Sequence, residues 1–330
     1  MSNDVVPDPH SAEDADQPAK APGSTPIGTM SEVSLHNEVA VAFLPPVEVL
    51  PDVSSSRVAE GMAAWLTCKS PGKPGPNEDA VAAIPVRDNR GILMVADGLG
   101  GHRGGRRASQ LMKTGLIRMV KRLSSGMAEP VIKISGVVPV PLATTNDLLG
   151  EQEFRSAILN EIEQVNQRLL RSRMGAATTL ALVEISKRRV RTYHVGDSEI
   201  LIVSQRGRIK YSSVSHSPIG YAVESGIMSA EEALYHPDRH LISNVIGSDQ
   251  MSVELGPWIS LSPRDTVLLA SDGLFDNLLQ EEIVEFIRIG RPVDCVRKLA
   301  ELARKRMLVP SMNVPSKPDD LSILLYRAVA

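Results

Sequence analysis

Short apolar runs bounded by polar or glycine-containing turns recur along the chain and predict β-strands. Two pairs of runs are separated by only a few polar residues, Arg87 to Arg90 in the first pair and Lys187-Arg188 in the second, a pattern typical of β-hairpins. The last two runs are almost wholly apolar, as expected for central strands of a sheet. The predicted strands are 79–86, 91–96, 178–186, 189–196, 199–204, 266–271 and 321–327.

Three longer segments carry apolar residues at spacings of three and four, the period of an amphipathic helix. They are 105–123, 151–171 and 292–307, and the third has Pro292 near its start, where a helix tolerates proline. Hairpins and helices follow one another without a strict strand–helix–strand alternation. We therefore expect an α+β sandwich rather than a doubly wound parallel sheet.

The beginning of the chain lacks any apolar period. Residues 1–40 contain no aromatic residue and are rich in Pro, Ala, Ser and Asp, so they cannot bury enough apolar surface to offset their chain entropy. We predict a disordered acidic and Pro-rich tail and linker at 1–56 and one folded domain at 57–330. Within that domain, 124–150 is expected to be a loop or an insertion.

Charge is distributed unevenly along the 330 residues. The net charge is −3, but residues 1–60 alone carry −8, which leaves +5 for the remainder. Eleven aromatic residues are too few for a base-stacking nucleic-acid surface, and no apolar run is long enough to span a membrane. Two cysteines, Cys68 and Cys295, can form neither a disulfide framework nor a structural zinc site. This usage favours a reducing, cytoplasmic location.

Acidic residues stand at the ends of several predicted strands. Asp97 and Asp272 each follow an apolar run directly and are each followed by glycine. Counting outward from the first hairpin turn places Asp79 opposite Asp97 at one edge of a sheet. Asp319 and Asp320 precede the last strand, and they reach Asp272 if that strand runs antiparallel to 266–271. Carboxylates without a His/Cys cluster nearby predict a site for Mg²⁺ or Mn²⁺.

Such a site has a definite chemistry. Two divalent ions about 4 Å apart activate a bridging water and stabilise charge on a phosphoryl group during in-line attack, with no protein nucleophile. Asp-Gly pairs are also common in turns and helix caps, so one pair alone carries little information. Their matched placement at strand ends favours the metal site.

Seven segments, taken in order along the chain, resemble the metal-dependent PP2C-type (PPM) serine/threonine phosphatases in their bacterial form. The resemblance covers roughly residues 61–328. The segments are Asn77-Glu78-Asp79-Ala80, VADGLGGHRGGRRAS (95–109), MGAATTLAL (174–182), HVGDSEILIV (194–203), 216–242, SDGLFDNL (271–278) and PDDLSILLYR (318–327).

This resemblance implies an αββα four-layer sandwich of two antiparallel sheets flanked by helices. It also implies hydrolysis of phosphoserine and phosphothreonine in proteins by a metal-bridging water, with two Mn²⁺ or Mg²⁺ ions and a third that binds weakly. Asp97 would bridge the two ions, and Asp97 and Asp272 are the expected catalytic carboxylates. The implied metal-binding residues are Asp79, Asp97, Gly98, Asp272 and Asp319, with Asp197 and Asp276 for the third ion.

Other residues leave alternatives open. The family's phosphate-binding arginine is replaced by Pro74, and the adjacent Lys73 is the candidate substitute, although it lacks the bidentate fork of arginine. This departure raises an alternative function, a catalytically weak PP2C-like module that binds or regulates phosphoproteins. His102, five residues after Asp97, is a candidate general acid, or it caps the glycine-rich loop.

The expected partners follow from the same resemblance. They are phosphorylated proteins, the products of a serine/threonine kinase in a signalling pathway. We expect neither nucleic acid nor membrane as a partner, and we expect a monomer.

Overall fold

The computed structural model describes residues 49–87, 89–100, 104–125, 150–311 and 314–329. The chain divides into two units, Met1–Val47 and Glu48–Ala330, and every described residue belongs to the second. The disorder predicted for 1–40 and most of the loop predicted at 124–150 lie outside the described residues. None of the described helices has the length and apolar character needed to cross a membrane.

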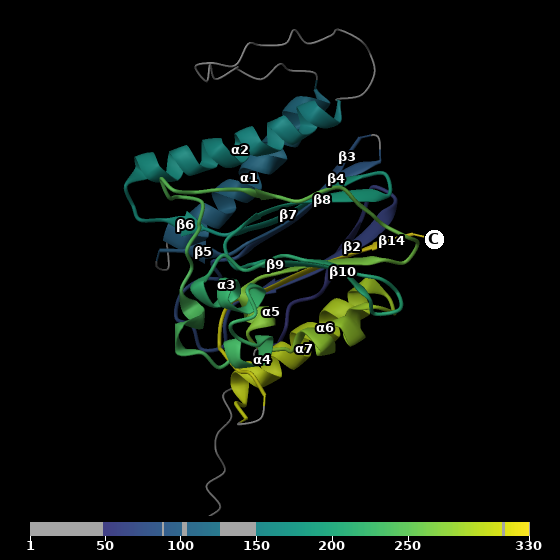
Figure 1. Cartoon of the computed structure of the whole chain (residues 1–330). Helices are drawn as coiled ribbons and strands as arrows, with labels where there is room; N and C mark the ends of the chain where they lie inside the picture. The colour runs from purple at the N-terminus through teal and green to yellow at the C-terminus, as the bar shows by residue number, and fades with distance from the viewer. Residues whose placement is uncertain (1–48, 88, 101–103, 126–149, 312–313, 330) are drawn as a thin grey trace, which may run out of the picture. The chain divides into compact units, whose positions relative to one another are not determined.

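Two six-stranded antiparallel sheets form the centre of the second unit (Figure 1). The first has the order β1-β2-β14-β13-β9-β10, and the second has the order β11-β8-β7-β4-β3 with β12 also paired to β8. The first sheet comprises β1 Ser54–Val58, β2 Gly61–Cys68, β14 Leu321–Ala328, β13 Thr266–Ala270, β9 Glu199–Val203 and β10 Ile209–Ser212. The second comprises β11 Glu254–Leu255, β8 Arg189–Val195, β7 Leu180–Ser186, β4 Arg90–Ala96, β3 Ala80–Val86 and β12 Ile259–Ser260.

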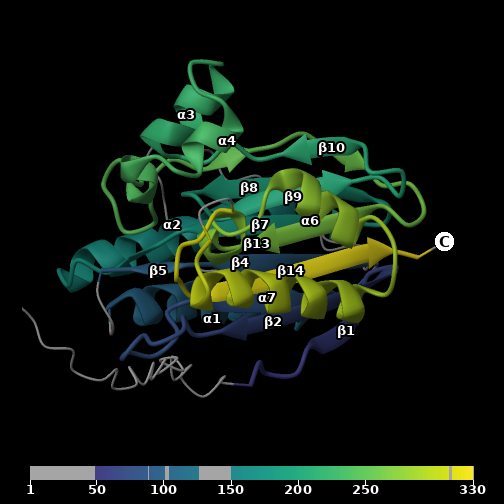
Figure 2. The same cartoon turned by 90° about the horizontal axis from the view of Figure 1, so that it is seen from below.

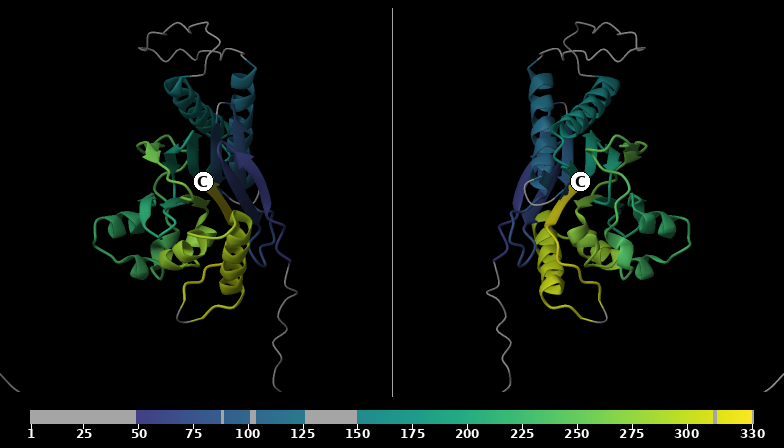
Figure 3. Two further views of the ribbon diagram at one scale, coloured as in Figure 1. Left: turned by 90° about the vertical axis from the view of Figure 1, so that its right-hand side faces the viewer. Right: turned by 90° about the vertical axis from the view of Figure 1, so that its left-hand side faces the viewer.

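Helices cover the outer face of each sheet, so the unit has four layers (Figures 1 and 3). Helices α1 and α2 lie on the second sheet, and α6 and α7 lie on the first, with α7 running along β14 in Figure 2. The predicted α+β sandwich of αββα type is therefore confirmed. The helices are α1 Gly104–Ser124, α2 Glu151–Ser172, α3 Pro218–Glu224, α4 Ala230–Ala233, α5 Asp272–Phe275, α6 Gln280–Ile287, α7 Pro292–Leu308 and the 3-10 helix η1 Pro237–His240.

Each interface between layers is an apolar core built from the predicted stripes and runs. Met112, Leu116 and Met119 of α1 are fully buried against the second sheet, and Val296 and Leu299 of α7 are fully buried against the first. A third cluster fills the space between the sheets. Burying one such side chain contributes roughly 1.5–3 kcal/mol, so these stripes hold the helices in place.

The predicted hairpins form with the predicted register. Ala80 pairs with Ala96 in the first hairpin, and Leu180 pairs with Val195 in the second. Strands β13 and β14 are also antiparallel, and Ala270 pairs with Ile323. Because neighbouring antiparallel strands run in opposite directions, the end of one strand lies beside the start of the next at one rim of the sandwich.

The sequence pattern did not indicate the first two strands. Three of the five residues of β1 are exposed and polar, so the strand has almost no apolar signal, yet all five pair with β2. The predicted start of the folded domain at residue 57 falls inside this strand. The short pair β5 Gly98–Leu99 and β6 Ala177–Thr178 was likewise not predicted, because two-residue strands leave no periodicity to detect.

Candidate metal centre

Strand ends from both sheets carry the acidic residues to the same rim. Asp79 precedes β3 and Asp97 follows β4, so the register of that hairpin places them side by side. Asp319 lies two residues before β14, whose start lies beside the end of β13 and hence beside Asp272. Asp197 lies in the turn between β8 and β9.

The backbone of Asp97 is fixed by two threonines, Thr178 at the end of β6 and Thr179, which follows it. The Asp97 N–H donates to Thr179 Oγ1 (2.9 Å), and the Asp97 carbonyl accepts from Thr179 N (2.8 Å) and Thr178 Oγ1 (2.7 Å). Thr179 and Thr178 are fully buried. Because both backbone groups of Asp97 are bonded within the protein, its carboxylate is held at the rim by a rigid support.

A serine at the end of β13 joins the two sheets at this rim. Ser271 Oγ donates to Asp79 Oδ2 (2.9 Å), and Ser322 N donates to Ser271 Oγ (3.0 Å). Asp79 is buried, with 4% of its surface exposed. The contact therefore fixes Asp79, which precedes a strand of the second sheet, against the paired strands β13 and β14 of the first.

Glycines allow the first turn of α1 to approach the Asp97-Gly98 turn. A Cβ atom at Gly98 would lie 2.2 Å from the carbonyl oxygen of Gly105, and a Cβ at Gly105 would lie 2.3 Å from the Gly98 carbonyl oxygen. Both contacts involve backbone atoms, which cannot move aside as a flexible side chain can. The Gly98 carbonyl, an expected metal ligand, is therefore placed by direct contact between two backbone segments.

Burial and mutual repulsion raise the pKa values of the clustered carboxyl groups. Burial is the main cause for each group. The charges of neighbouring aspartates raise the pKa values further. The pKa of Asp97 lies well above its usual range because of burial first, and then because of Asp79 and Asp272. The pKa reaches about 7 for Asp79 and for Asp319 and about 8 for Asp197. Such a cluster is stable in its ionised form only with cations among its oxygens.

Several carboxylate oxygens of this cluster have no protein donor. Among the described residues, Asp79 Oδ1, Asp197 Oδ1, Asp272 Oδ1 and Glu78 Oε1 are buried and accept no hydrogen bond. Buried acceptors without partners are costly, and hard oxygen donors are the ligands that Mg²⁺ and Mn²⁺ prefer. The residues present therefore fit divalent cations.

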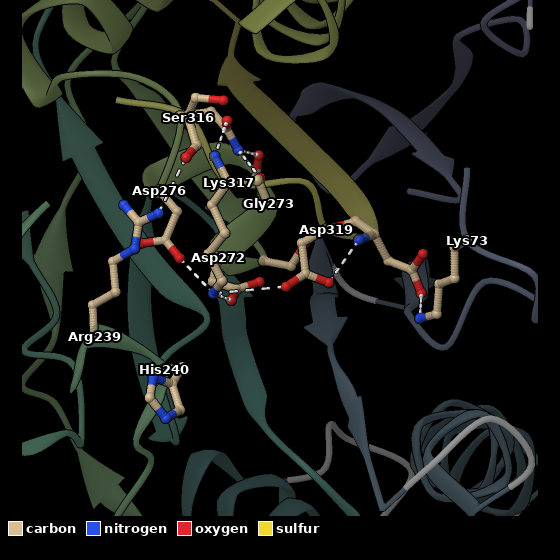
Figure 4. Close-up of polar contacts among 12 residues, drawn as sticks. Lys73, Arg239, His240, Asp272, Gly273, Asp276, Ser316, Lys317 and Asp319 are labelled. Atoms are coloured by element: carbon tan, nitrogen blue, oxygen red, sulfur yellow. Dashed lines mark hydrogen bonds and ion pairs between the residues drawn. The ribbon is translucent and has the colours of Figure 1, made fainter. Parts of the chain in front are cut away.

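One protein cation does lie within the cluster (Figure 4). Lys317 Nζ contacts Asp272 Oδ2 and Asp276 Oδ2, both at 2.6 Å, and lies 3.6 Å from Asp319 Oδ2. Its neighbouring carboxylates raise the Lys317 pKa against the opposing effect of burial. In the sequence, the position of Lys317 two residues before Asp319 is the one sign of this role.

The candidate phosphate-binding residue, Lys73, lies in a neighbouring ion-pair group. Its Nζ contacts Glu78 Oε2 and Asp320 Oδ2, both at 2.6 Å (Figure 4). Asp320 also accepts from the backbone N–H groups of Ser70 (2.8 Å) and Glu78 (2.7 Å). Lys73 therefore ties the segment before β3 to the segment before β14.

Two predicted site residues remain, Asp276 and His102. Asp276 follows α5 and joins the cluster through its contact with Lys317, and its pKa is raised by burial and then by Asp272. His102, the candidate general acid, lies outside the described residues.

A second group of potential ligands lies beside the rim. Ring nitrogens of His194 and His216 and a carboxylate oxygen of Glu254 lie within 4.8 Å of one another. His216 Nδ1 accepts the N–H of Gly196 (3.1 Å), so its Nε2 carries the proton that faces Glu254 at 3.1 Å. A metal-ligating histidine needs the reverse arrangement, with one free nitrogen toward the ion. The hydrogen bonds of His216 therefore favour a structural role for that residue.

Comparison with known proteins identifies relatives for most of the chain. Residues 72–308 match the family model for protein phosphatase 2C. A serine/threonine phosphatase stp from Listeria welshimeri is 27% identical over 258 residues, which cover 76% of this chain and 90% of that protein. The protein phosphatase PhpP of Streptococcus pneumoniae is 29% identical over 224 residues, covering 66% of this chain and 80% of that protein.

Solved structures show the same fold. The serine/threonine phosphatase of S. agalactiae superposes with a TM-score of 0.63 at 25% identity and covers 81% of this chain and 99% of its own. The catalytic domain of the phosphatase PstP, solved with two manganese ions, superposes with a TM-score of 0.60 at 23% identity and covers 81% of this chain and 98% of its own.

Proposed function

The chain belongs to the protein phosphatase 2C family and is a metal-dependent serine/threonine protein phosphatase, and we propose that the carboxylate cluster at the rim of the sandwich is its active centre. The observation that carries this proposal is a set of buried carboxylate oxygens that accept no hydrogen bond from any described residue, on residues delivered by strands of both sheets. The proposed ligands of the two ions are Asp79, Asp97, Gly98, Asp272 and Asp319. Asp197 and Asp276 lie at the outer position, where the family resemblance implies a weakly bound third ion.

The cations that fit these residues are two Mn²⁺ or Mg²⁺ ions. When bound, such ions lower the pKa of a water to make a nucleophile at neutral pH and offset the charge of the phosphoryl oxygens. The contribution of the chain is to hold the carboxylates in place. Thr178 and Thr179 fix Asp97, and Ser271 fixes Asp79, so little reorganisation is needed when the substrate arrives.

The exposure of the cluster suits a substrate that arrives from solution. Asp79 is buried behind the rim, whereas the side chain of Asp319 is 33% exposed. We assign proton transfer to the leaving serine or threonine oxygen to His102, on sequence grounds alone. Lys73 is the proposed phosphate contact, because its side chain is 19% exposed and an ammonium has three donors, of which two face Glu78 and Asp320.

The expected substrates are phosphoproteins made by a serine/threonine kinase, and the expected location is the cytoplasm. Cys68 and Cys295 are free thiols, which is consistent with a reducing compartment. The alternative function, a catalytically weak binding module, is not favoured, because the chain retains all the acidic residues expected as ligands and the relatives named above are phosphatases.

Restoring the missing arginine tests the choice between these two functions. We expect the wild type to turn over a phosphothreonine peptide repeatedly in Mn²⁺. We expect Pro74→Arg to raise kcat/KM by roughly ten-fold, mainly through KM, because arginine adds a charge-assisted contact to the phosphate. Steady-state kinetics on both proteins measure this. Negligible wild-type turnover, with a gain of about a thousand-fold or more in the variant, would support the binding module instead.

A further inference from the structure

The ammonium group of Lys317 lies where the outer acidic residues converge. Its contacts with Asp272 and Asp276, both at 2.6 Å, are at the short end for charge-assisted hydrogen bonds, and Figure 4 shows the side chain extended toward both carboxylates. The side chain is 20% exposed, although lysine is ordinarily a solvated surface residue. This placement puts a fixed positive charge among carboxylates that otherwise repel one another.

The backbone around Lys317 is built to hold it there. Asn277, which is fully buried, accepts from the Lys317 N–H at its Oδ1 (2.9 Å) and donates from its Nδ2 to the Lys317 carbonyl (2.8 Å). The Asn277 carbonyl in turn accepts from Arg306 of α7 (2.7 Å). Pro318 follows directly and restricts the backbone further. Lys317 is therefore anchored to the core through both of its peptide groups.

The two carboxylate oxygens of Asp272 have different surroundings. Asp272 Oδ2 contacts Lys317, while Asp272 Oδ1 is buried and accepts no hydrogen bond within the described residues. The inner oxygen is thus left for the divalent ions shared with Asp79 and Asp97. Asp276 also directs its Oδ2 to Lys317. This contact lies at the outer position, where the family resemblance implies a third divalent ion. A divalent ion and an ammonium cannot share this position without strong repulsion.

We propose that Lys317 is a built-in cation that replaces a divalent ion between Asp272 and Asp276, so that the centre binds two divalent ions and not three. The inference rests on the proposed function, because it assumes that the inner carboxylates bind metal.

Counting bound Mn²⁺ tests the proposal. The metal-free wild type, titrated with Mn²⁺ by calorimetry and by the EPR signal of free Mn²⁺, is expected to bind two ions per chain. Lys317→Met, which keeps the length of the side chain and removes its charge, is expected to bind three. The additional ion should be lost again in the double variant Lys317→Met, Asp276→Asn. If Lys317→Met does not unfold cooperatively, Lys317→Gln serves in its place.

Lys210→Met is the matched control. Lys210 is another half-buried lysine paired with an aspartate, Asp265, outside the cluster, so its loss should leave the count at two. Three ions in the wild type, or two in both Lys317 variants, would overturn the proposal while leaving the proposed function intact. A wild type that binds no Mn²⁺ would instead contradict the proposed function itself.

Discussion

Replacing Asp97 by asparagine is expected to lower the Mn²⁺-dependent kcat on a phosphothreonine peptide by about a thousand-fold or more. Asp97 is the carboxylate expected to contact both inner ions, and three backbone hydrogen bonds hold it at the rim. Loss of several kcal/mol of transition-state stabilisation corresponds to a factor of this size. Release of inorganic phosphate under saturating Mn²⁺ measures the effect.

Asp294→Asn is a suitable control for this experiment. Asp294 lies in the first turn of α7, pairs with Arg291 at the surface and undergoes the same chemical change without touching the cluster. It should retain activity close to that of the wild type. If Asp97→Asn kept activity within about ten-fold of the wild type, Asp97 could not be an essential metal ligand.

The same Asp97→Asn change is expected to stabilise the metal-free protein. Without cations, the Asp97 carboxylate is repelled by Asp79, Asp197, Asp272 and Asp319, and the neutral amide removes that repulsion. We expect a gain of about 1 kcal/mol in the free energy of unfolding, or roughly 2–4 °C in Tm, in the presence of EDTA. Thermal unfolding followed by circular dichroism measures this difference.

Adding Mn²⁺ should reverse the order of the Tm values of the wild type and Asp97→Asn. A ligand that binds only the folded state stabilises it by about 2.7 kcal/mol at a concentration one hundred times its Kd, and the variant should lose most of this gain. The wild type would then unfold at the higher temperature. A lower Tm for Asp97→Asn in EDTA, or an equal Mn²⁺-induced shift in both proteins, would argue that the cluster does not act as a metal centre.

Much of the fold was predictable because its signals are local. The hairpin of β3 and β4 was indicated by two apolar runs and a polar turn, and its register then placed Asp79 beside Asp97. The local pattern leaves the relative direction of β13 and β14 open, and the structure shows that they are antiparallel. Since strand ends follow from register, the position of most of the candidate ligands could be derived from spacing.

Contacts between side chains from distant segments could not be derived in this way. Lys73 and Asp320 are far apart in the sequence, and nothing in either local pattern indicates their ion pair. The contacts of Lys317 could not be predicted either, because a lysine in a Pro-containing loop is ordinarily solvated. Its position depends on Asn277, whose side chain holds the loop from the turn between α5 and α6. Strand β1 was missed because its exposed residues carry no apolar period.

The most direct test of the central claim is the metal dependence of the wild-type enzyme. Purified protein is assayed on a phosphothreonine peptide in Mn²⁺, in excess EDTA, and in EDTA followed by excess Mn²⁺. If the carboxylate cluster is the active centre, hydrolysis is rapid in Mn²⁺, falls to background in EDTA and returns when Mn²⁺ is restored. Hydrolysis that continues undiminished in EDTA would contradict the account.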